Sequence, residues 1–393
     1  MSYKAIYTYA WDLADHGIAN AIEAFREQGL DTVTFAGSYH AGKFLRPQGR
    51  SGKVYFPEDG TVYFKADPSR YGKIKPVANS ILESQDVLGG VVGADAMATN
   101  VWLVLLHNTN LGMRHPESVV RNAFGDPYFY NLCPSAPEAR AYAIGLATDV
   151  TTSYPVSGLS MEAPGFTPYA HGFHHEFGLV RQNTWFEGYM GLCFCDHCVG
   201  AAAKAGIDAE GLRRKVAGLL GDYLESDVDL PQDMAQAMWL ADIESDGELR
   251  AYLEFRSRQV TSLVAEIRDR VRKDVEIAVI PSVARPTGGA WYEGSDLTAL
   301  MDVTGIIEAC FYEPSAARIK ADLHDVKRRL GGKGRLRGIL RPSFPDIENK
   351  AEFLAAIDTL AAGGVTELAF YNWGHLRRSS MDWIGEALAR VPA

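Results

Sequence analysis

Three of the chain's five cysteines lie close together in the loop GLCFCDHC. Thiolates spaced as in Cys193, Cys195 and Cys198 can wrap one tetrahedral ion, and Zn²⁺ takes four such ligands at about 2.3 Å. His197 lies within the same tight loop and is an awkward fourth ligand. Cys133 is the better candidate, because it precedes the helix that leads into the fourth predicted strand. We therefore predict a closed zinc site with a structural role.

Two carboxylates suggest a different chemistry. Hydrolysis of a glycosidic bond needs one carboxyl group to protonate the leaving oxygen and a second to act as base or nucleophile. Glu162 ends a predicted strand, where barrel enzymes keep catalytic groups, and burial there would raise its pKa as a general acid requires. Glu308, inside a later strand, is the favoured partner. The alternative is that Glu308 pairs with Arg341 and only shapes the pocket.

The segment YAHGFHHEFG, residues 169–178, follows Glu162 closely and is rich in polar side chains. Three histidines and a glutamate can hold a catalytic metal, grip sugar hydroxyls or lie in solvent, and the pattern leaves all three open. Their order differs from the helical zinc motif His-Glu-x-x-His. These residues are His171, His174, His175 and Glu176.

Aromatic and polar residues also crowd the ends of the predicted strands. Sugar rings stack on aromatic faces, so this composition suits a carbohydrate pocket, although core packing explains each residue singly. The predicted substrate-binding residues are Trp11, His107, Asn108, His174, His175, Glu176, Tyr312, Arg341, Asn372 and Trp373.

The elements that must position these residues alternate along the chain. Eight segments show the apolar runs or alternation of strands, and segments with helical spacing separate most of them. Such an order predicts a (β/α)8 TIM barrel, and the lack of a glycine-rich loop after the first strand disfavours an open doubly wound sheet. The predicted strands are 4–11, 31–37, 101–107, 156–165, 275–283, 303–312, 336–344 and 366–374.

Long insertions follow the second, third and fourth strands, on the side where barrel enzymes build their sites. We predict a single domain over residues 1–393, with a zinc-bound loop insertion around 164–250.

Composition limits the partners. The chain has 393 residues and a net charge of −10, which disfavours nucleic acid and anionic membranes. The first residues lack the apolar core of a secretory signal, and no apolar run reaches about 18 residues. We expect a cytoplasmic protein with a small carbohydrate substrate and no organic cofactor. The oligomeric state stays open, a homo-oligomer included.

Residues 125–215 resemble the family 42 glycoside hydrolases, which are β-galactosidases. The resemblance lies in CPSAPEARAYA, in the strand that ends at Glu162, and in CFCDHC. It implies zinc ligation by Cys133, Cys193, Cys195 and Cys198, and an acid/base role for Glu162. Two positions depart from that family: Met161 replaces the usual asparagine, and Arg341 lies where the strand-seven nucleophile is expected.

The favoured function is therefore hydrolysis of a small glycoside or oligosaccharide. One alternative is a metal-dependent sugar isomerase, epimerase or lyase that uses the histidine segment. Another is a barrel that binds carbohydrate without catalysis.

Overall fold

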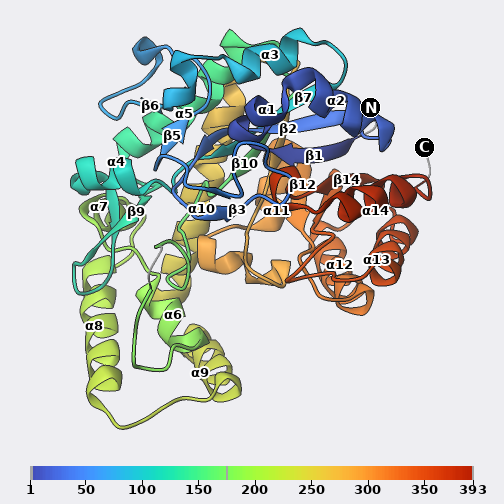
Figure 1. The fold of residues 1–393 in the computed structure, drawn as a ribbon. Coiled ribbons are helices and arrows are strands. Elements are labelled where there is room, and N and C mark those ends of the chain that lie inside the picture. Colours follow the sequence, from blue (N-terminus) through green and yellow to red (C-terminus); the bar gives the residue numbers. More distant parts are fainter. Residues whose placement is uncertain (1–2, 174–175, 392–393) are drawn as a thin grey trace.

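Eight parallel strands close into a barrel at the centre of the molecule (Figure 1). The computed structural model describes residues 3–173 and 176–391. The barrel strands are β1 (Lys4–Thr8), β2 (Thr32–Tyr39), β7 (Ala98–Val104), β10 (Gly158–Glu162), β11 (Glu276–Val279), β12 (Ile306–Cys310), β13 (Arg335–Leu340) and β14 (Glu367–Phe370). Each pairs with the next, and β1 pairs with both β2 and β14. The predicted (β/α)8 barrel is confirmed.

Helices surround this barrel, so its strands are covered on both faces. Every residue of β2 and of β12 is buried, and β7 is buried from Thr99 to Val104, which explains the apolar run at its end. The helices are α1 (Ala10–His16), α2 (Ile18–Glu27), α3 (Val87–Gly93), α4 (Thr109–Arg114), α5 (Pro137–Ser153), α6 (Thr184–Met190), α7 (Asp196–Lys204), α8 (Ala209–Glu225), α9 (Gln232–Ser245), α10 (Gly247–Arg270), α11 (Leu297–Thr304), α12 (Ala316–Leu330), α13 (Lys350–Ala362) and α14 (Arg378–Leu388).

The first strand is shorter than the sequence predicts. It ends at Thr8, and the residues predicted to finish it form α1 instead. Ala10 and Trp11 are buried, so the start of this short helix resembles the end of a strand in sequence. Gly17, with a φ of +82°, separates α1 from α2.

Three long segments follow the second, third and fourth barrel strands. The first contains β3 (Phe44–Leu45), β4 (Val54–Tyr55), β5 (Thr61–Val62), β6 (Val77–Ala78), the 3-10 turns η1 (Pro68–Arg70) and η2 (Ser80–Glu83), and α3. The second contains α4, η3 (Pro116–Ser118), β8 (Val119–Arg121) and β9 (Pro127–Leu132). The third contains α6 to α9, of which α8 and α9 project from the barrel (Figure 1). Two further turns, η4 (Thr287–Glu293) and η5 (Trp373–His375), follow β11 and β14.

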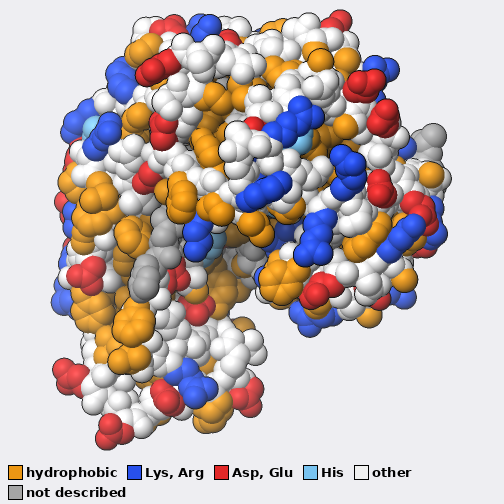
Figure 2. Space-filling model, in the orientation of Figure 1, with side chains coloured by type: hydrophobic (Ala, Val, Ile, Leu, Met, Phe, Trp, Pro, Cys, Tyr) orange, Lys and Arg blue, Asp and Glu red, His pale blue; other side chains and the backbone are white. Residues whose placement is uncertain are grey.

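Exposed apolar side chains lie on this third segment. Phe177 and Leu179, ahead of α6, are 80% and 91% exposed, and Met234 on α9 is 54% exposed. Figure 2 shows hydrophobic side chains on the surface of the projecting part.

The barrel interior contains a polar layer. Glu308 is fully buried, and its Oε1 accepts hydrogen bonds from the hydroxyls of Tyr3 at 2.9 Å and Tyr7 at 3.0 Å. The Ser160 hydroxyl donates to Oε2, and the Asn100 amide donates to Ser160 Oγ at 2.8 Å. These contacts connect β1, β7, β10 and β12 across the barrel.

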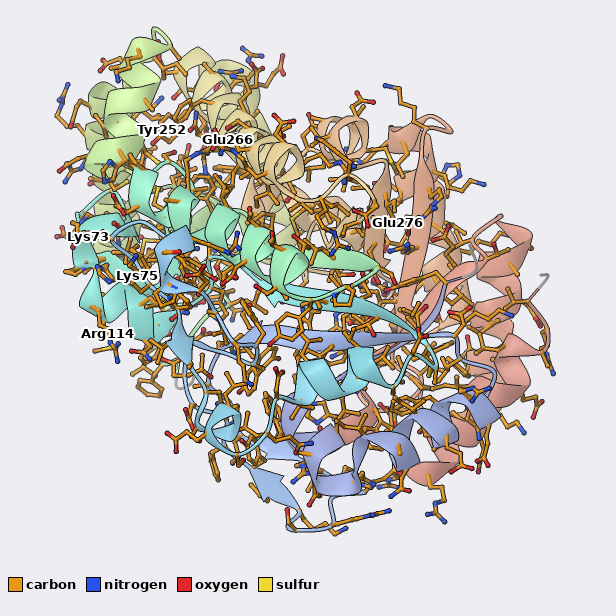
Figure 3. All side chains as sticks on the ribbon, turned by 90° about the horizontal axis from the view of Figure 1, so that it is seen from above. Lys73, Lys75, Arg114, Tyr252, Glu266 and Glu276 are labelled. Atoms are coloured by element: carbon orange, nitrogen blue, oxygen red, sulfur yellow. The ribbon has the colours of Figure 1, made fainter. Side chains whose placement is uncertain are left out.

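An ion-pair network spans the starts of three strands. Arg337, 2% exposed, binds Glu276 through Nη2 at 2.6 Å and Glu367 through Nε at 2.8 Å. Arg335 binds the same two carboxylates at 2.8 and 3.0 Å. The guanidinium of Arg337 also lies 3.7 Å from the centre of the Tyr3 ring. Glu276, at the start of β11, and Glu266, on α10, are labelled in Figure 3.

Candidate active site

A pocket of about 310 Å³ opens at the carboxyl ends of the barrel strands. Each of the eight strands, or the residues directly after it, contributes to the lining. This is the face at which TIM-barrel enzymes place their active sites. The lining residues are Tyr7, Tyr39, His40, Trp102, Glu162, His171, Ile280, Val283, Arg285, Cys310, Tyr312, Ile339, Arg341 and Tyr371.

Glu162 is the carboxylate in this pocket, at the end of β10 as the sequence predicts. The Trp102 indole donates a hydrogen bond to its Oε2 at 2.7 Å. Burial raises the pKa of Glu162 to about 7, and the Trp102 hydrogen bond opposes part of that rise. The next residue, Ala163, has a φ of +51°, so the chain turns sharply as it leaves the strand. At neutral pH this carboxyl group is therefore balanced between its protonated and ionised forms.

Two arginines lie at the same mouth. Arg341, after β13, stacks on the Tyr312 ring with its guanidinium carbon 3.9 Å from the ring centre. Its Nε binds Asp346, and Arg285 binds the other oxygen of that carboxylate. Arg285 also donates to the Tyr312 carbonyl at 2.7 Å. Asp346 is 1% exposed, so one buried carboxylate holds two partly exposed guanidinium groups.

Hydrogen-bonded tyrosines form one wall. The Tyr9 hydroxyl donates to Tyr39 at 3.1 Å and lies 2.7 Å from the Tyr371 hydroxyl. Tyr371 follows β14 and packs against Trp102, with ring centres 5.8 Å apart. Burial raises the pKa of Tyr39 and of Tyr371, so these hydroxyls remain neutral donors and acceptors.

Glu308, the predicted second carboxylate, lies below the pocket and does not line it. Tyr7 lies between them, because it lines the pocket and donates to Glu308. Both Glu308 oxygens are already used within the barrel, and Arg341 binds Asp346 instead. Glu308 therefore lies in the polar layer of the barrel, and Arg341 pairs with Asp346 rather than, as the alternative had expected, with Glu308.

The histidine segment is only partly described. His171 lines the pocket, whereas His174 and His175 lie outside the described residues. Glu176 is exposed and accepts a hydrogen bond from the Phe173 amide at 3.1 Å. The His107 ring lies 4.5 Å from that of His40, just outside the pocket lining.

Asn108 has a structural role. Its Oδ1 caps α4 by accepting from the Leu111 amide at 2.9 Å, and its Nδ2 donates to the Gly60 carbonyl at 3.0 Å. It thereby connects the segment after β7 to the segment after β2. Nothing in this geometry directs the amide at a sugar.

Trp11, Asn372 and Trp373 also lie outside the pocket lining. Trp11 stacks on Tyr9, with ring centres 4.2 Å apart, and so supports the tyrosine wall from behind. Asn372 is fully buried and caps η5 through the Gly374 amide. The η5 turn carries the Trp373 indole outside the barrel, where it packs on Phe25 of α2.

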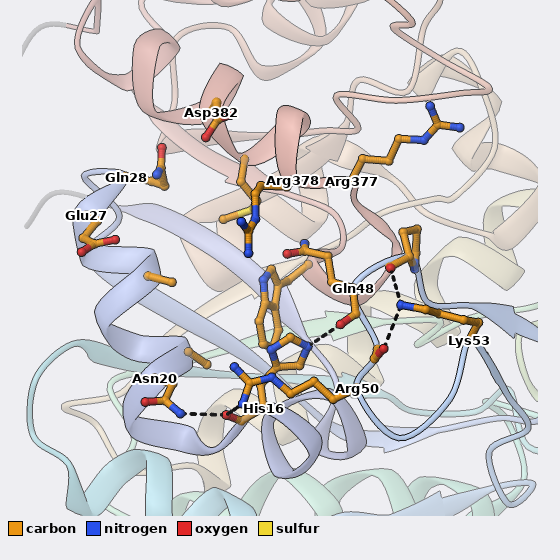
Figure 4. Close-up of a pocket in the computed structure, with 16 residues that line it drawn as sticks. His16, Asn20, Glu27, Gln28, Gln48, Arg50, Lys53, Arg377, Arg378 and Asp382 are labelled. Carbon is orange, nitrogen blue, oxygen red and sulfur yellow. Dashed lines mark hydrogen bonds between the residues drawn. The ribbon is translucent and has the colours of Figure 1, made fainter.

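Trp373 instead lines a wider groove of about 840 Å³ between α2, α14 and the loop before β4 (Figure 4). Its polar groups mostly hold that loop. Lys53 donates to the carbonyls of Pro47 and Gly49, and Arg50 donates to the His16 carbonyl. The groove is larger than the barrel pocket, but it lacks a comparable buried acid. The barrel mouth is the better candidate site.

Glu293 is a second acidic group that the sequence reasoning did not identify. It is 4% exposed, at the end of η4, and accepts from the Ser282 hydroxyl and from the Val283 amide at 3.2 Å. Burial raises its pKa to about 8, and the nearby Glu162 adds to the rise. Its position depends on how the segment after β11 folds back, which no local motif reveals.

The four predicted metal ligands converge. Cys133, Cys193, Cys195 and Cys198 are buried and unpaired by disulfides, and their sulfur atoms lie within 4.8 Å of one another. Cys133 Sγ is 3.5 Å from the sulfurs of Cys195 and Cys198 and 3.9 Å from that of Cys193. A tetrahedron with arms of about 2.3 Å has edges of about 3.8 Å, so the cluster can hold one metal ion.

The surroundings of the cluster fix it in place. Tyr252 of α10, labelled in Figure 3, donates its hydroxyl to the Cys193 carbonyl. Arg256, one turn further on, is buried and donates to the Gly191 carbonyl at 3.1 Å. Its positive charge would offset part of the negative charge of a metal-thiolate group. The cluster thus ties α7 and its loop to both α5 and α10.

Comparisons with known proteins bear on the fold. No protein-family model matches the sequence, and no curated protein matches it. Among solved structures, the glycoside hydrolase domain of PgaB (BpsB) from Bordetella bronchiseptica is similar, with a TM-score of 0.61 and 12% identity, over 99% of this chain and 99% of that one. Alpha-L-fucosidase isoenzyme 2 from Paenibacillus thiaminolyticus has a TM-score of 0.54 and 12% identity, over 99% of this chain and 49% of that one.

One neighbour is described as a glycoside hydrolase domain and the other as an alpha-L-fucosidase, and they do not single out family 42. At 12% identity the likeness establishes a shared barrel. The chain is therefore a TIM-barrel protein of the architecture on which these glycoside hydrolases are built.

Proposed function

We propose that this protein hydrolyses a glycosidic bond, with Glu162 as the group that protonates the leaving oxygen. The observation that carries the proposal is a partly buried carboxyl group at the barrel mouth, whose pKa is raised to about 7 by loss of solvation. A general acid works best when its pKa is close to the working pH. The aromatic lining, with Trp102 and Tyr371 beside the acid, suits the apolar face of a sugar ring.

The hydrogen bond from Trp102 orients the acid. Because the indole donates to Oε2, the proton can reside on Oε1 and be passed from there to the leaving oxygen. As the proton leaves, the indole stabilises the carboxylate that forms. After departure, the same carboxylate can take a proton from the incoming water.

The test uses Glu162→Gln, which keeps the shape of the side chain and removes its proton. We expect loss of about 10²–10⁴-fold in kcat/KM on glycosides with poor leaving groups. An activated aryl glycoside, which needs little protonation, should lose less. Glu254→Gln, on the exposed surface of α10, is the matched control. Equal losses on both substrate types would contradict the assignment.

A second candidate function is carbohydrate binding without catalysis. Among the described residues that line the pocket, Glu162 is the only carboxylate, and Glu308 is committed to the barrel interior. A wild-type protein that binds sugars but cleaves no glycoside in a panel of α- and β-hexosides would favour this function. Retained binding in Glu162→Gln would then separate recognition from chemistry.

We further propose that the cysteine cluster holds a structural Zn²⁺. Four thiolates fill a tetrahedral shell and leave no position for substrate or water. The support is the set of sulfur separations and the complete burial of the ligands. In this proposal the ion stabilises the segment after β10 and takes no part in the reaction.

We propose a small carbohydrate as the substrate, and we propose neither nucleic acid nor a membrane as a partner. None of the helices in residues 3–173 and 176–391 combines the length and apolar character needed to cross a bilayer. The proposed cytoplasmic location rests on the sequence argument alone.

A further inference from the structure

The charge balance of the pocket indicates what kind of sugar it selects. Arg341 and Arg285 both line the pocket, and their side chains are 24% and 40% exposed. Among the described residues, one carboxylate, that of Asp346, binds them, and it is 1% exposed behind them. Two positive charges therefore face one negative charge, and one guanidinium charge is left uncompensated.

The acid of the pocket does not cancel this charge. Burial raises the pKa of Glu162 to about 7, so the group is only partly ionised at neutral pH, and its carboxylate binds Trp102 rather than either arginine. β10 and β13 are separated by two other strands in the sheet order, so Glu162 and Arg341 approach the pocket from different sides. The pocket therefore has the carboxyl group of Glu162 on one side and the positive charge of Arg341 on the other.

The donors of Arg341 are also oriented. Its Nε is held by Asp346, and its plane is stacked on the Tyr312 ring, which fixes the guanidinium. Within the described part of the chain its terminal nitrogens make no hydrogen bond, and Arg341 lines the pocket. A planar guanidinium held in this way matches the two oxygens of a carboxylate or sulfate group. A neutral sugar would leave this charge facing only water and hydroxyls.

We propose that the pocket selects a sugar that carries an anionic oxygen group, the carboxylate of a uronic acid or the sulfate of a 6-sulfated sugar, and that Arg341 and Arg285 bind this group. The inference rests on the proposed hydrolase function for its kinetic readout but not for its binding readout. The volume of about 310 Å³ is at the small end for ligand pockets, which suits one such sugar ring next to the cleaved bond.

The first measurement compares matched substrate pairs: aryl glucuronides against aryl glucosides, aryl galacturonides against aryl galactosides, and the 6-sulfated forms, each as both anomers. We expect at least about tenfold higher kcat/KM for an anionic member, because a hydrogen bond to a charged group contributes about 1.5–3 kcal/mol. Comparison of the uronides with the 6-sulfated glycosides shows whether the pocket prefers a carboxylate or a sulfate. Added salt should reduce this advantage, since it screens the arginines.

Variants of the two arginines then test which side chain causes the preference for an anionic sugar. Arg341→Gln should remove most of the advantage, and Arg341→Lys should restore part of it, because lysine keeps the charge and loses the planar fork. Arg285→Gln is a milder second variant, since that side chain is the more exposed. Arg258→Gln, on the surface of α10, is the control for loss of one charge. Thermal unfolding checks that each variant is folded.

The outcomes separate the two proposals. Faster cleavage of a neutral sugar than of its anionic partner would overturn this inference and leave the hydrolase function standing. If nothing is cleaved, calorimetry with free glucuronate, galacturonate, 6-sulfated sugars and their neutral forms decides. Tighter binding of an anion that Arg341→Gln abolishes would support the inference alone, and no preference for any anion would overturn it.

Discussion

Glu162 takes its chemistry from two opposing influences. Burial raises its pKa and the Trp102 indole lowers it again, with the balance at about 7. The position of Glu162 is predictable, because a glutamate that ends a barrel strand reaches the mouth. Trp102 and Arg285 are not predictable as partners, since their roles depend on strand register and on loop folding that one sequence does not reveal.

Changing Trp102 to phenylalanine should move the pH dependence of the reaction. Without the indole hydrogen bond the ionised form of Glu162 is less stabilised, so its pKa should rise above about 7. The fall in kcat/KM at alkaline pH would then begin at higher pH than in the wild type. A pH–rate profile measures this, with Trp239→Phe as a buried indole remote from the pocket. An unmoved alkaline limb would count against Glu162 as the acid.

Glu293 should make the protein less stable as pH rises. Its folded pKa is raised from 4.5 to about 8, so folding favours the protonated form, and this stability is lost as pH rises between those values. The effect on the free energy of unfolding is on the order of a few kcal/mol. Glu293→Gln keeps the acceptor for Ser282 and should flatten this dependence in urea unfolding at pH 5 and pH 9. Parallel profiles for the two proteins would refute the assignment.

At the scale of elements, the barrel strands were predictable because both faces are buried and apolar runs result. The helices between the strands were also predictable in kind, because segments with helical spacing separate most of the predicted strands. The sequence did not reveal the direction in which the short connections after the strands turn their side chains. Trp373 was expected in the pocket, but η5 turns it outward, while Tyr371 lines the pocket two residues earlier.

The ion-pair network at the starts of β11, β13 and β14 allows a matched comparison. Arg337→Ala should destabilise the protein by about 2–3 kcal/mol, because it removes a buried guanidinium and leaves the partly buried carboxylates of Glu276 and Glu367 with less compensation. Arg335→Ala, at a position 39% exposed, should cost only about 0–1 kcal/mol. Chemical unfolding of both variants gives the two values. Similar costs would mean that burial does not set the strength of these pairs.

The cysteine cluster should stabilise the folded segment that contains α6 to α9. Cys195→Ser should lose the metal and lower the thermal midpoint, since a structural metal contributes folding free energy. Cys310→Ser is the control, because that buried thiol lies in the barrel and outside the cluster. Metal analysis of the purified proteins should find about one zinc per chain in the wild type. A metal-free wild type that unfolds at the same temperature as Cys195→Ser would exclude the zinc proposal.

For the whole molecule, chelation distinguishes the two metal hypotheses. With a structural thiolate site, a mild chelator should leave glycosidase activity unchanged, whereas a strong one should lower the thermal midpoint of the entire protein. The contrary result is reversible loss of activity under mild chelation while the cysteine-bound metal is retained. That would favour a catalytic ion held by the segment from His171 to Glu176.

The polar layer inside the barrel has a consequence for how the chain completes its fold. All three hydroxyls that bind Glu308 come from the first four barrel strands or, for Tyr3, from the residue directly before β1, whereas the carboxylate itself comes from the last four. The amino-terminal half therefore emerges during synthesis with three donors whose acceptor has not yet been made. In a chain cut between β10 and β11, one fragment would contain the Glu308 carboxylate and the other its hydroxyl donors, and each would lack its hydrogen-bond partner. Neither fragment alone could satisfy these polar groups. Glu308 and its donors meet only when the barrel closes.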